Sequence, residues 1–293
     1  MNKGIKYALL SALISGVAIF YNKQVLVKGI DPLIFNIIKN GSTAILLSMV
    51  LLAGGKINRL TQDFKKSWKE LLGIAAIGGS LPFLLYFTGL TQTSAINANL
   101  IHKSLFIWVT LLAIPLLKEN LGIFQVAGFV LIALSNIVLG FKGFDFNSGE
   151  FLILLATLFW AGENIIAKKV LKRTGSLTVA WSRMFFGSLI LTGIAAWQSK
   201  LHLIVSLDPA ILIPVLPSVI LLTLYVISFF TALKYAPATE VAAILILATP
   251  VTNMLQAVWS GSFIPSVQIH NLLFSLSGIL LVYVFRRKPS LNR

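Results

Sequence analysis

Residues 210–232 read AILIPVLPSVILLTLYVISFFTA, a run without a single charged side chain. As an α-helix this run would be about 34 Å long, since a helix rises 1.5 Å per residue. That is enough to cross the hydrocarbon core of a bilayer, which is about 30 Å thick. The run lacks the strict apolar and polar alternation of strands in a membrane barrel. It therefore predicts a transmembrane helix.

The rest of the chain has the same character. It is 57% hydrophobic and 11% charged over 293 residues, far more apolar than a soluble domain. No segment between the apolar runs is long enough to bury a core of its own. We therefore expect an all-α polytopic membrane protein. Its ten transmembrane helices are predicted at residues 5–27, 31–53, 71–91, 95–117, 121–141, 150–171, 176–198, 210–232, 238–260 and 266–285.

The segments at 1–30 and 54–70 need separate consideration. The first apolar run follows two lysines, as in a secretory signal, but no cleavage site of small residues follows it, so we keep it as a span. Residues 54–70 carry apolar side chains at helical spacing among cations. That pattern indicates an amphipathic helix lying in the membrane interface.

Basic residues are unevenly distributed between the two sides that alternating spans define. The formal net charge of +15 could indicate nucleic acid. With both termini inside, however, the outside segments hold only Lys28, Lys142 and Lys200. Positively charged loops stay in the cytoplasm. We therefore expect a multi-pass protein of the cell membrane, plasma or inner, with both termini cytoplasmic (N-in/C-in). Its partner is the lipid bilayer and not nucleic acid.

The second half of the chain repeats the first. Residues 4–10 (GIKYALL) resemble residues 149–155 (GEFLILL), and FTGL at 87–90 aligns with FTAL at 230–233. Each unit has five spans, an odd number, so the two units cross the membrane in opposite directions. We expect two inverted five-helix repeats, at residues 1–145 and 146–293. Secondary transporters often have this arrangement and bind substrate near the midplane.

Lys39 and Arg183 lie early in the second helix of each repeat, residues 93–98 and 236–241 open the fourth helices, and residues 117–121 (LKENL) are followed by Gly128. In the order of these motifs the chain resembles the EamA group of the drug/metabolite transporter superfamily along nearly its whole length. The resemblance implies transport of a metabolite but does not identify it. The chain departs from the family pattern at three positions: Lys39 replaces the usual arginine, Ser262 stands in place of a glutamate and Asn271 in place of a fifth-helix glycine.

Polar side chains lie inside the predicted spans, where an ionisable group costs about 2.5–3.5 kcal/mol to insert and faces the bundle interior or water. In the second and fourth spans these side chains recur at three- and four-residue spacing, so each set shares one helix face. Two polar stripes, both cationic, indicate a shared aqueous cavity with aromatic walls. The candidate substrate-binding residues are Asn36, Lys39, Asn40, Asn99, His102, Lys103, Trp160, Trp181 and Arg183.

Glu163 is the only acidic residue deep in a predicted span. It could take up a coupling proton, or balance the charge of Lys103, Arg183 or Lys23, and the sequence leaves both roles open. His102 could relay protons or only be hydrogen-bonded. The lysines and asparagines could also serve structure alone, through pairing and bonds between helices.

Motifs for catalysis are missing from the sequence. It has no phosphate-cradling Gly-rich loop, no His-Glu-x-x-His and no cysteine, so we expect no enzyme, cofactor or metal site. Our leading hypothesis is a secondary transporter, an exporter of small polar organic metabolites such as amino acids or other anionic or zwitterionic compounds, working by alternating access. Protons as the coupling ion, and monomer or homodimer, are left open. The alternatives are a non-transporting scaffold or receptor and a membrane-embedded lipid-modifying enzyme.

Overall fold

A computed structural model describes residues 2–90, 92–93, 95–138, 147–207, 209–261 and 266–285, and every regular element among them is a helix. Seven stretches are long and apolar enough to cross a membrane, so the chain is a polytopic membrane protein. They are Lys3–Leu26 (α1), Pro32–Ala53 (α2), Ile57–Gly89 (α3, Ile57–Gly79, and α4, Leu81–Leu90), Ser148–Val170 (α8), Ser176–Trp197 (α9), Leu212–Tyr235 (within α11, Pro209–Tyr235) and Ala238–Ser260 (α12, Ala238–Ile244, to α13, Ala248–Ser260).

Three shorter apolar helices coincide with the three remaining predicted spans. The count of ten crossings stays a prediction, because the end of the span at 121–141 lies outside the described residues, as do Lys142 and Ser262. The shorter stretches belong to α5 (Ala95–Lys103) with α6 (Leu105–Leu117), to α7 (Ile123–Val138) and to α14 (Ser266–Val284).

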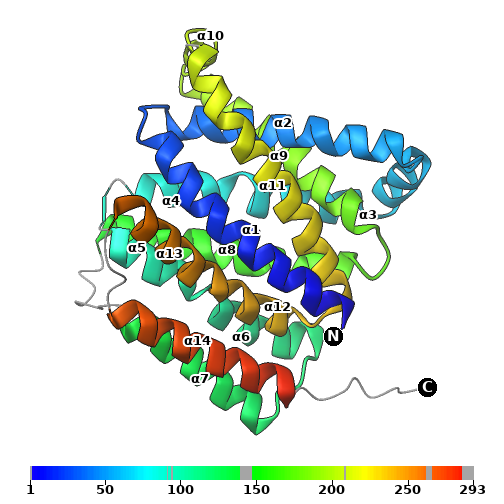
Figure 1. The fold of residues 1–293 in the computed structure, drawn as a ribbon. Helices are drawn as coiled ribbons and strands as arrows, with labels where there is room; N and C mark the ends of the chain where they lie inside the picture. The colour runs from blue at the N-terminus through cyan, green and yellow to red at the C-terminus, as the bar shows by residue number, and fades with distance from the viewer. Residues whose placement is uncertain are drawn as a thin grey trace.

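The long helices lie side by side, and those of the two halves of the chain interleave (Figure 1). Helix α1 packs against α11 and α13, whereas α8 packs against α3, α4 and α6. Helix α2 packs against α9, and α7 against α14. The N-terminus lies at the same end of the bundle as the α2–α3 turn and the α6–α7 turn (Figure 1). We call this the basic end, because most of the lysines and arginines outside the spans lie there.

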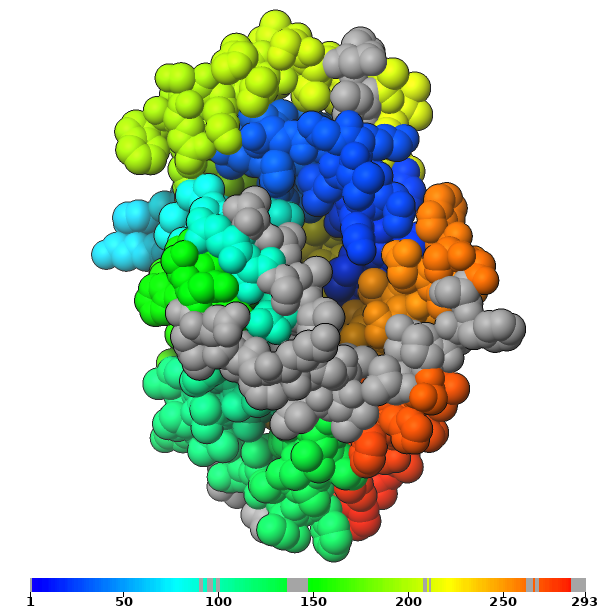
Figure 2. All heavy atoms as spheres, turned by 90° about the vertical axis from the view of Figure 1, so that its left-hand side faces the viewer, coloured from blue at the N-terminus to red at the C-terminus, as the bar shows by residue number. Residues whose placement is uncertain are grey.

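The opposite end of the bundle is hollowed. Figure 2 views the molecule from that side, and a depression opens between α1, α13 and the α4–α5 segment. Helix α10 (His202–Val205) is a short exposed helix on the connection from α9 to α11. His202 is exposed there.

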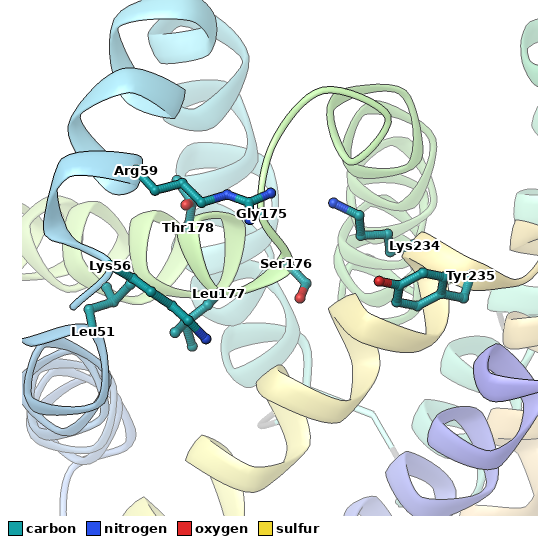
Figure 3. Close-up of a pocket in the computed structure, with 9 residues that line it drawn as sticks. All are labelled: Leu51, Lys56, Arg59, Gly175, Ser176, Leu177, Thr178, Lys234 and Tyr235. Carbon is teal, nitrogen blue, oxygen red and sulfur yellow. The ribbon is translucent and has the colours of Figure 1, made fainter. Parts of the chain in front are cut away.

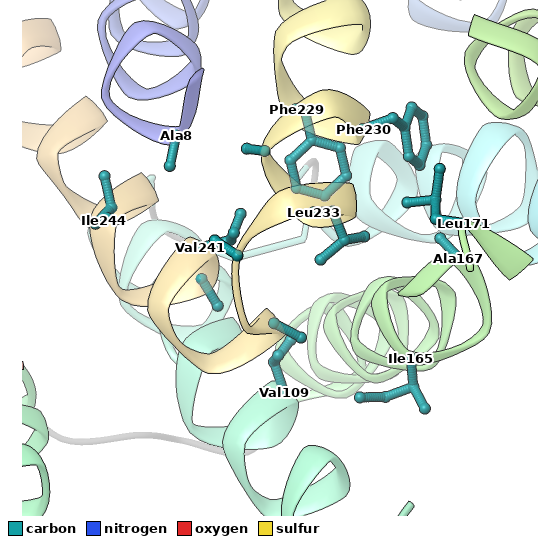
Figure 4. Packing of buried hydrophobic residues seen from close by; sticks show 14 of the residues in the cluster. Ala8, Val109, Ile165, Ala167, Leu171, Phe229, Phe230, Leu233, Val241 and Ile244 are labelled. Atoms are coloured by element: carbon teal, nitrogen blue, oxygen red, sulfur yellow. The ribbon is translucent and has the colours of Figure 1, made fainter. Parts of the chain in front are cut away.

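The main apolar core lies where α1, α8, α11 and α12 meet, and its side chains point toward one another (Figure 4). Between lipid-facing helices the stabilisation comes from close packing, because lipid is as apolar as the core. Small residues permit this closeness: a Cβ at Gly4 would lie 2.6 Å from Ala236, and one at Gly16 would lie 2.6 Å from Val251. The residues labelled in Figure 4 are Ala8, Val109, Ile165, Ala167, Leu171, Phe229, Phe230, Leu233, Val241 and Ile244.

Helices α7 and α14 are in contact at two different kinds of position. A Cβ at Gly128 would lie 2.6 Å from the carbonyl oxygen of Gly278, and one at Gly278 would lie 2.6 Å from that of Gly128. Farther along the pair, Asn271 Nδ2 donates a hydrogen bond to the Ser135 carbonyl, at 2.5 Å. Asn271, which stands in place of the family glycine, therefore joins the two helices by a hydrogen bond. A glycine at this position would instead allow the two backbones to approach closely.

The segment at 54–70 is helical from Ile57, and the backbone leaves helical geometry at Ser67 (φ −141°, ψ 23°). This break separates the amphipathic turns from the apolar part of α3, close to the boundary expected from the sequence. Arg173 donates from Nε to Ser67 Oγ, at 2.9 Å, and its guanidinium also pairs with Glu70. Both bonds hold the break against the α8–α9 turn.

Candidate functional site

A second break, between α3 and α4, frees two main-chain acceptors inside the bundle. Ser80 lies outside helical geometry (φ −138°, ψ −72°) and Pro82 follows it. Proline has no N–H, so the carbonyl of Gly78 receives no bond from the residue four positions later. The amide of Phe83 donates to Ser80, at 3.0 Å, instead of to Gly79. The carbonyl ends of α3, where the helix dipole is negative, therefore face other helices.

Arg183 of α9 occupies this negative end. Its Nη2 donates to the Gly78 carbonyl at 2.9 Å, while its Nε and Nη2 contact the two carboxylate oxygens of Glu163 at 2.5 and 3.3 Å. Both side chains are buried, at 8% and 3% exposure. A Cβ at Gly78 would lie 2.0 Å from the Glu163 Cδ, so only glycine leaves room for the carboxylate. Of the counter-ion roles left open by the sequence, the structure assigns Glu163 to Arg183.

Lys39 of α2 and Arg183 both lie near the ring of Phe83. Its Nζ is 4.6 Å from the centroid of Phe35 and 5.7 Å from that of Phe83, and the Arg183 Cζ is 5.8 Å from the latter. The side chain is buried, yet it forms no ion pair within the described part of the chain. A buried ammonium beside aromatic rings, with no ion-pair partner among the described residues, is available to an anionic ligand.

Aromatic rings continue the site from Phe83 toward α5. Trp160 of α8 contacts Phe83, Tyr86 and His102, with ring centroids 5.5, 5.8 and 4.9 Å away. Its Nε1 donates to the Gly78 carbonyl at 3.2 Å, which fixes the indole against the break. The Nδ1 of His102 is buried and has no hydrogen-bond partner among the described residues.

The asparagines of α2 present unused acceptors next to Lys39. Asn40 Nδ2 donates to the Gly79 carbonyl at 3.3 Å, and Asn36 Nδ2 donates to Pro32 in its own helix at 2.8 Å. The Oδ1 atoms of both are buried without a partner in the described part of the chain. An unsatisfied buried acceptor costs about 1–3 kcal/mol, so these atoms are suited to receive hydrogen bonds from a ligand.

We call these residues the central cluster: Lys39, Phe83, His102, Trp160, Glu163 and Arg183, with the carbonyls of Gly78 and Gly79. It joins α2, α4, α5, α8 and α9 at the break between α3 and α4. No group of three or more metal-ligating His, Cys, Asp or Glu side chains occurs in the described ranges. The arrangement offers a positive charge, aromatic faces and amide oxygens, which is the chemistry of an organic anion or zwitterion site.

Four of the sequence candidates are not joined to the cluster by a described contact, and one of them, Asn36, bonds only within its own helix. Trp181 stacks on Phe185, at 4.7 Å between centroids, and donates to Ser48 at 2.8 Å. Lys103 is buried, at the end of α5, and forms no ion pair with any described residue. The side chain of Asn99 lies outside the described part of the structure. Their roles stay predictions.

Sequence reasoning missed Phe35, Phe83 and Tyr86. The glycine pair at 78–79 before Pro82 indicates that a bend is permitted there, but not that Gly78 makes room for Glu163. The aromatic residues gave no signal of their own, because apolar rings are ordinary in a membrane span. Only the fold places them beside cations.

Comparison with known proteins defines the class. The EamA-like transporter family matches the chain twice, over residues 2–141 and 147–284. The chain belongs to the EamA-like transporter family, which is part of the drug/metabolite transporter superfamily.

Individual relatives agree with this assignment. An uncharacterized transporter from Methanothermobacter thermautotrophicus (strain Delta H) is 24% identical over 221 residues, which are 72% of this chain and 62% of that protein. The chain therefore spans less than two thirds of the length of that relative. A solved structure, described as the crystal structure of a protein, matches with a TM-score of 0.81 and 13% identity over 96% of both chains. At this identity the likeness establishes the fold alone.

Proposed function

We propose that this protein is a secondary transporter that exports small polar organic metabolites, such as amino acids and other anionic or zwitterionic compounds, across the cell membrane. It works by alternating access between two inverted five-helix repeats, at residues 1–145 and 146–293, with both termini in the cytoplasm. The double family match, which divides the chain near the same point, supports two repeats.

Packing supports the inverted relationship. When the two repeats are matched to each other, α1 corresponds to α8, α11 corresponds to the α3–α4 unit, and α13 corresponds to α6. The contacts of α1 with α11 and α13 then correspond to those of α8 with α3–α4 and α6. Helices α2 and α9 correspond to each other and are in contact, and the same holds for α7 and α14. Such symmetry is expected of two repeats that rock against each other around a central site.

The observation that carries the substrate proposal is the charge balance in the central cluster. Glu163 neutralises Arg183 through a two-point contact, whereas Lys39 has no carboxylate among the described residues. The substrate carboxylate takes the place of that missing counter-ion. Its ammonium or other donors bond to the free Oδ1 atoms of Asn36 and Asn40, and the rings of Phe83 and Trp160 cover its apolar part.

Glu163 serves charge balance in this conformation. Because Arg183 holds both carboxylate oxygens, a proton reaches Glu163 only when the pair opens. Proton coupling through Glu163 would therefore require a second conformation. His102 belongs to the central cluster, and Lys103 follows it in the chain; both stay candidates for contact with substrate.

The hollowed end of the bundle supports an opening on the side away from the N-terminus (Figure 2). Because the basic residues gather at the N-terminal end, the positive-inside rule places that end in the cytoplasm and the hollow outside. The described conformation would then be the one that releases an exported substrate. The monomer suffices for the central cluster, since the five helices that contribute to it come from one chain.

Counterflow in proteoliposomes tests the proposal. Vesicles loaded with a metabolite pool, with and without a pH gradient, identify the transported compound and show whether protons drive it. Lys39→Met keeps the apolar stem and removes the charge, and we expect at least a tenfold loss of counterflow, the worth of one charge-assisted hydrogen bond. The exposed Lys23 of α1 gives the matched control, Lys23→Met, which should retain flux.

The melting temperature separates the binding role from a structural one. No ion pair breaks in Lys39→Met, so the variant should melt within a few degrees of the native chain. Full counterflow in this variant would refute the role of Lys39. An absence of saturable flux for every metabolite would favour a scaffold, and product formation in detergent would favour an enzyme.

A further inference from the structure

Two helix contacts at the basic end join two groups of helices. Helix α8 packs against α3, α4, α5 and α6, and we call this group the α8 bundle. Helix α1 packs against α11, α12 and α13, and we call this group the α1 bundle. At the basic end α6 packs against α12, and α8 packs against α11. Each of these contacts therefore joins the α8 bundle to the α1 bundle.

The corresponding contacts at the opposite end differ. When the repeats are matched, the contact of α6 with α12 corresponds to one of α13 with α5, and the contact of α8 with α11 corresponds to one of α1 with the α3–α4 unit. Neither of these pairs packs together in the described part of the chain. The depression in Figure 2 opens there, between α1, α13 and the α4–α5 segment. The two bundles therefore meet at the basic end and are apart at the other end.

A carboxylate makes the first of the two closing contacts. Glu119 follows α6, and its Oε1 accepts a hydrogen bond from the amide of Ala238 at 2.7 Å. Its Oε2 accepts from the amide and the hydroxyl of Thr239, at 3.1 and 2.8 Å. These are the first two residues of α12, where the helix dipole is positive. The N-cap residue Pro237 makes no side-chain bond to α12, so the cap comes from the α8 bundle.

A lysine makes the second closing contact. Lys168 lies in the last turn of α8, and its Nζ donates hydrogen bonds to the carbonyls of Leu233 and Ala236, at 2.7 and 2.6 Å. These carbonyls lie at the C-terminal end of α11, where the helix dipole is negative and favours a cation. Lys168 also interacts electrostatically with Glu119. The α8 bundle thus presents one anion and one cation to the helix ends of the α1 bundle that each of them suits.

A cavity of about 220 Å³ at the same end leaves both contacts closed (Figure 3). It lies between the α2–α3 turn, the start of α9 and the end of α11, and its lining includes Arg59, Lys234 and Tyr235. No residue of α6, α8 or α12 lines it. The cavity therefore lies beside the closing contacts and does not pass between the two bundles.

We propose that Glu119 and Lys168 form a latch that holds the basic end closed while the opposite end is open. The inference rests on the proposed function, in which the basic end faces the cytoplasm and has to open during alternating access. For that opening α11 and α12 move away from α6 and α8, so the bonds of both residues break together. These bonds are charge-assisted, and such bonds are roughly twice as strong as neutral ones. Lys23, which corresponds to Lys168 in the first repeat, is exposed.

Cysteine labelling of the full chain in lipid nanodiscs tests the latch, because the native sequence contains no cysteine. Two buried positions of the main apolar core serve as reporters (Figure 4). Val241→Cys reports on α12, which packs against α6, and Ala167→Cys reports on α8, which packs against α11. The rate of reaction with N-ethylmaleimide follows the population of the open form. Glu119→Gln and Lys168→Met should each raise this rate about tenfold, because a charge-assisted contact is lost.

The effect of each variant on the distant reporter separates a latch from two local contacts. A latch predicts that Glu119→Gln also speeds labelling of Ala167→Cys, and that Lys168→Met also speeds labelling of Val241→Cys. Thr239→Val removes one bond to Glu119 without changing any charge, so it should speed both reporters by a smaller factor. Lys23→Met is the matched control and should speed neither reporter.

Thermal melts identify the folded variants before labelling, and Thr239→Val keeps the test decisive where a charge variant is unfolded. Faster labelling of both reporters in the latch variants, with Lys23→Met unchanged, would establish the latch. A variant that speeds only the reporter at its own contact, equal rates in all variants, or faster labelling in Lys23→Met would overturn the proposal. Labelling needs no substrate, so an absence of metabolite counterflow would contradict the proposed function alone.

Discussion

Gly78 gives the sharpest test of the central cluster. In Gly78→Ala the new Cβ would lie 2.0 Å from the Glu163 Cδ and 2.3 Å from each carboxylate oxygen. The carboxylate has to move, and it then leaves Arg183. Overpacking costs about 1–3 kcal/mol and breaking a buried pair about 3–5 kcal/mol. Alanine returns up to about 1 kcal/mol of helix propensity. We therefore expect a net destabilisation of at least about 3 kcal/mol.

A loss of about 3 kcal/mol corresponds to a melting temperature about 6 °C lower, at about 2 °C per kcal/mol for a chain of this size. Thermal unfolding in detergent, followed by intrinsic tryptophan fluorescence, measures it. Gly73→Ala is the matched control in the same helix, since a Cβ at Gly73 meets nothing within 4 Å. Its melting temperature should stay the same or rise. Equal melting temperatures for the two variants would show that Glu163 does not occupy the space beside Gly78.

Two further predictions concern charges. Arg183→Gln leaves a buried carboxylate unpaired and should lower the free energy of unfolding by about 3–5 kcal/mol. Adding Glu163→Gln should restore about 1–3 kcal/mol of that loss. Additive losses in the double variant would contradict an ion pair between the two residues. Burial works against ionisation of Asp31, but hydrogen bonds from Lys200 and from two backbone amides outweigh it and hold the pKa of this carboxyl below its ordinary value. Its contribution to stability is therefore present above about pH 4 and disappears as the pH falls through the lowered value. Asp31→Asn should lower the melting temperature at pH 7, and the difference should shrink in acid; a constant difference would contradict this.

Much of the fold was readable in the sequence because lipid imposes simple rules on it. An apolar run has to satisfy its backbone hydrogen bonds internally, so each predicted span became a helix wherever the chain is described. The glycine pair at 78–79 and Pro82 permit a bend, but the partners of the carbonyls that the break frees were not predicted. They depend on donors in other helices, as Gly78 finds Arg183, and an apolar pattern along one span holds no information on neighbouring spans.

The site was partly predictable for the same reason. Intramembrane charge indicated Lys39, Arg183 and Glu163 at once, because charge is costly in lipid. Which cation Glu163 pairs with was decided by the packing of α8 and α9 on α3, which spacing rules along the sequence cannot give. The glutamate of LKENL, Glu119, was known only as part of a motif. In the structure it accepts hydrogen bonds from the amides of Ala238 and Thr239 and so caps α12.

The interleaved packing of α1 also has a consequence in time. Its partners α11 and α13 come from the second half of the chain, and roughly 180 residues separate the end of α1 from the start of α11. At a synthesis rate of about 5–20 residues per second, α1 waits in the membrane for roughly 10–40 seconds before α11 exists. Throughout that interval the small-residue face at Gly4 and Gly16 is open to lipid or to another chain. The nascent first half is thus the stage at which the protein is most exposed to mispairing and to membrane quality control.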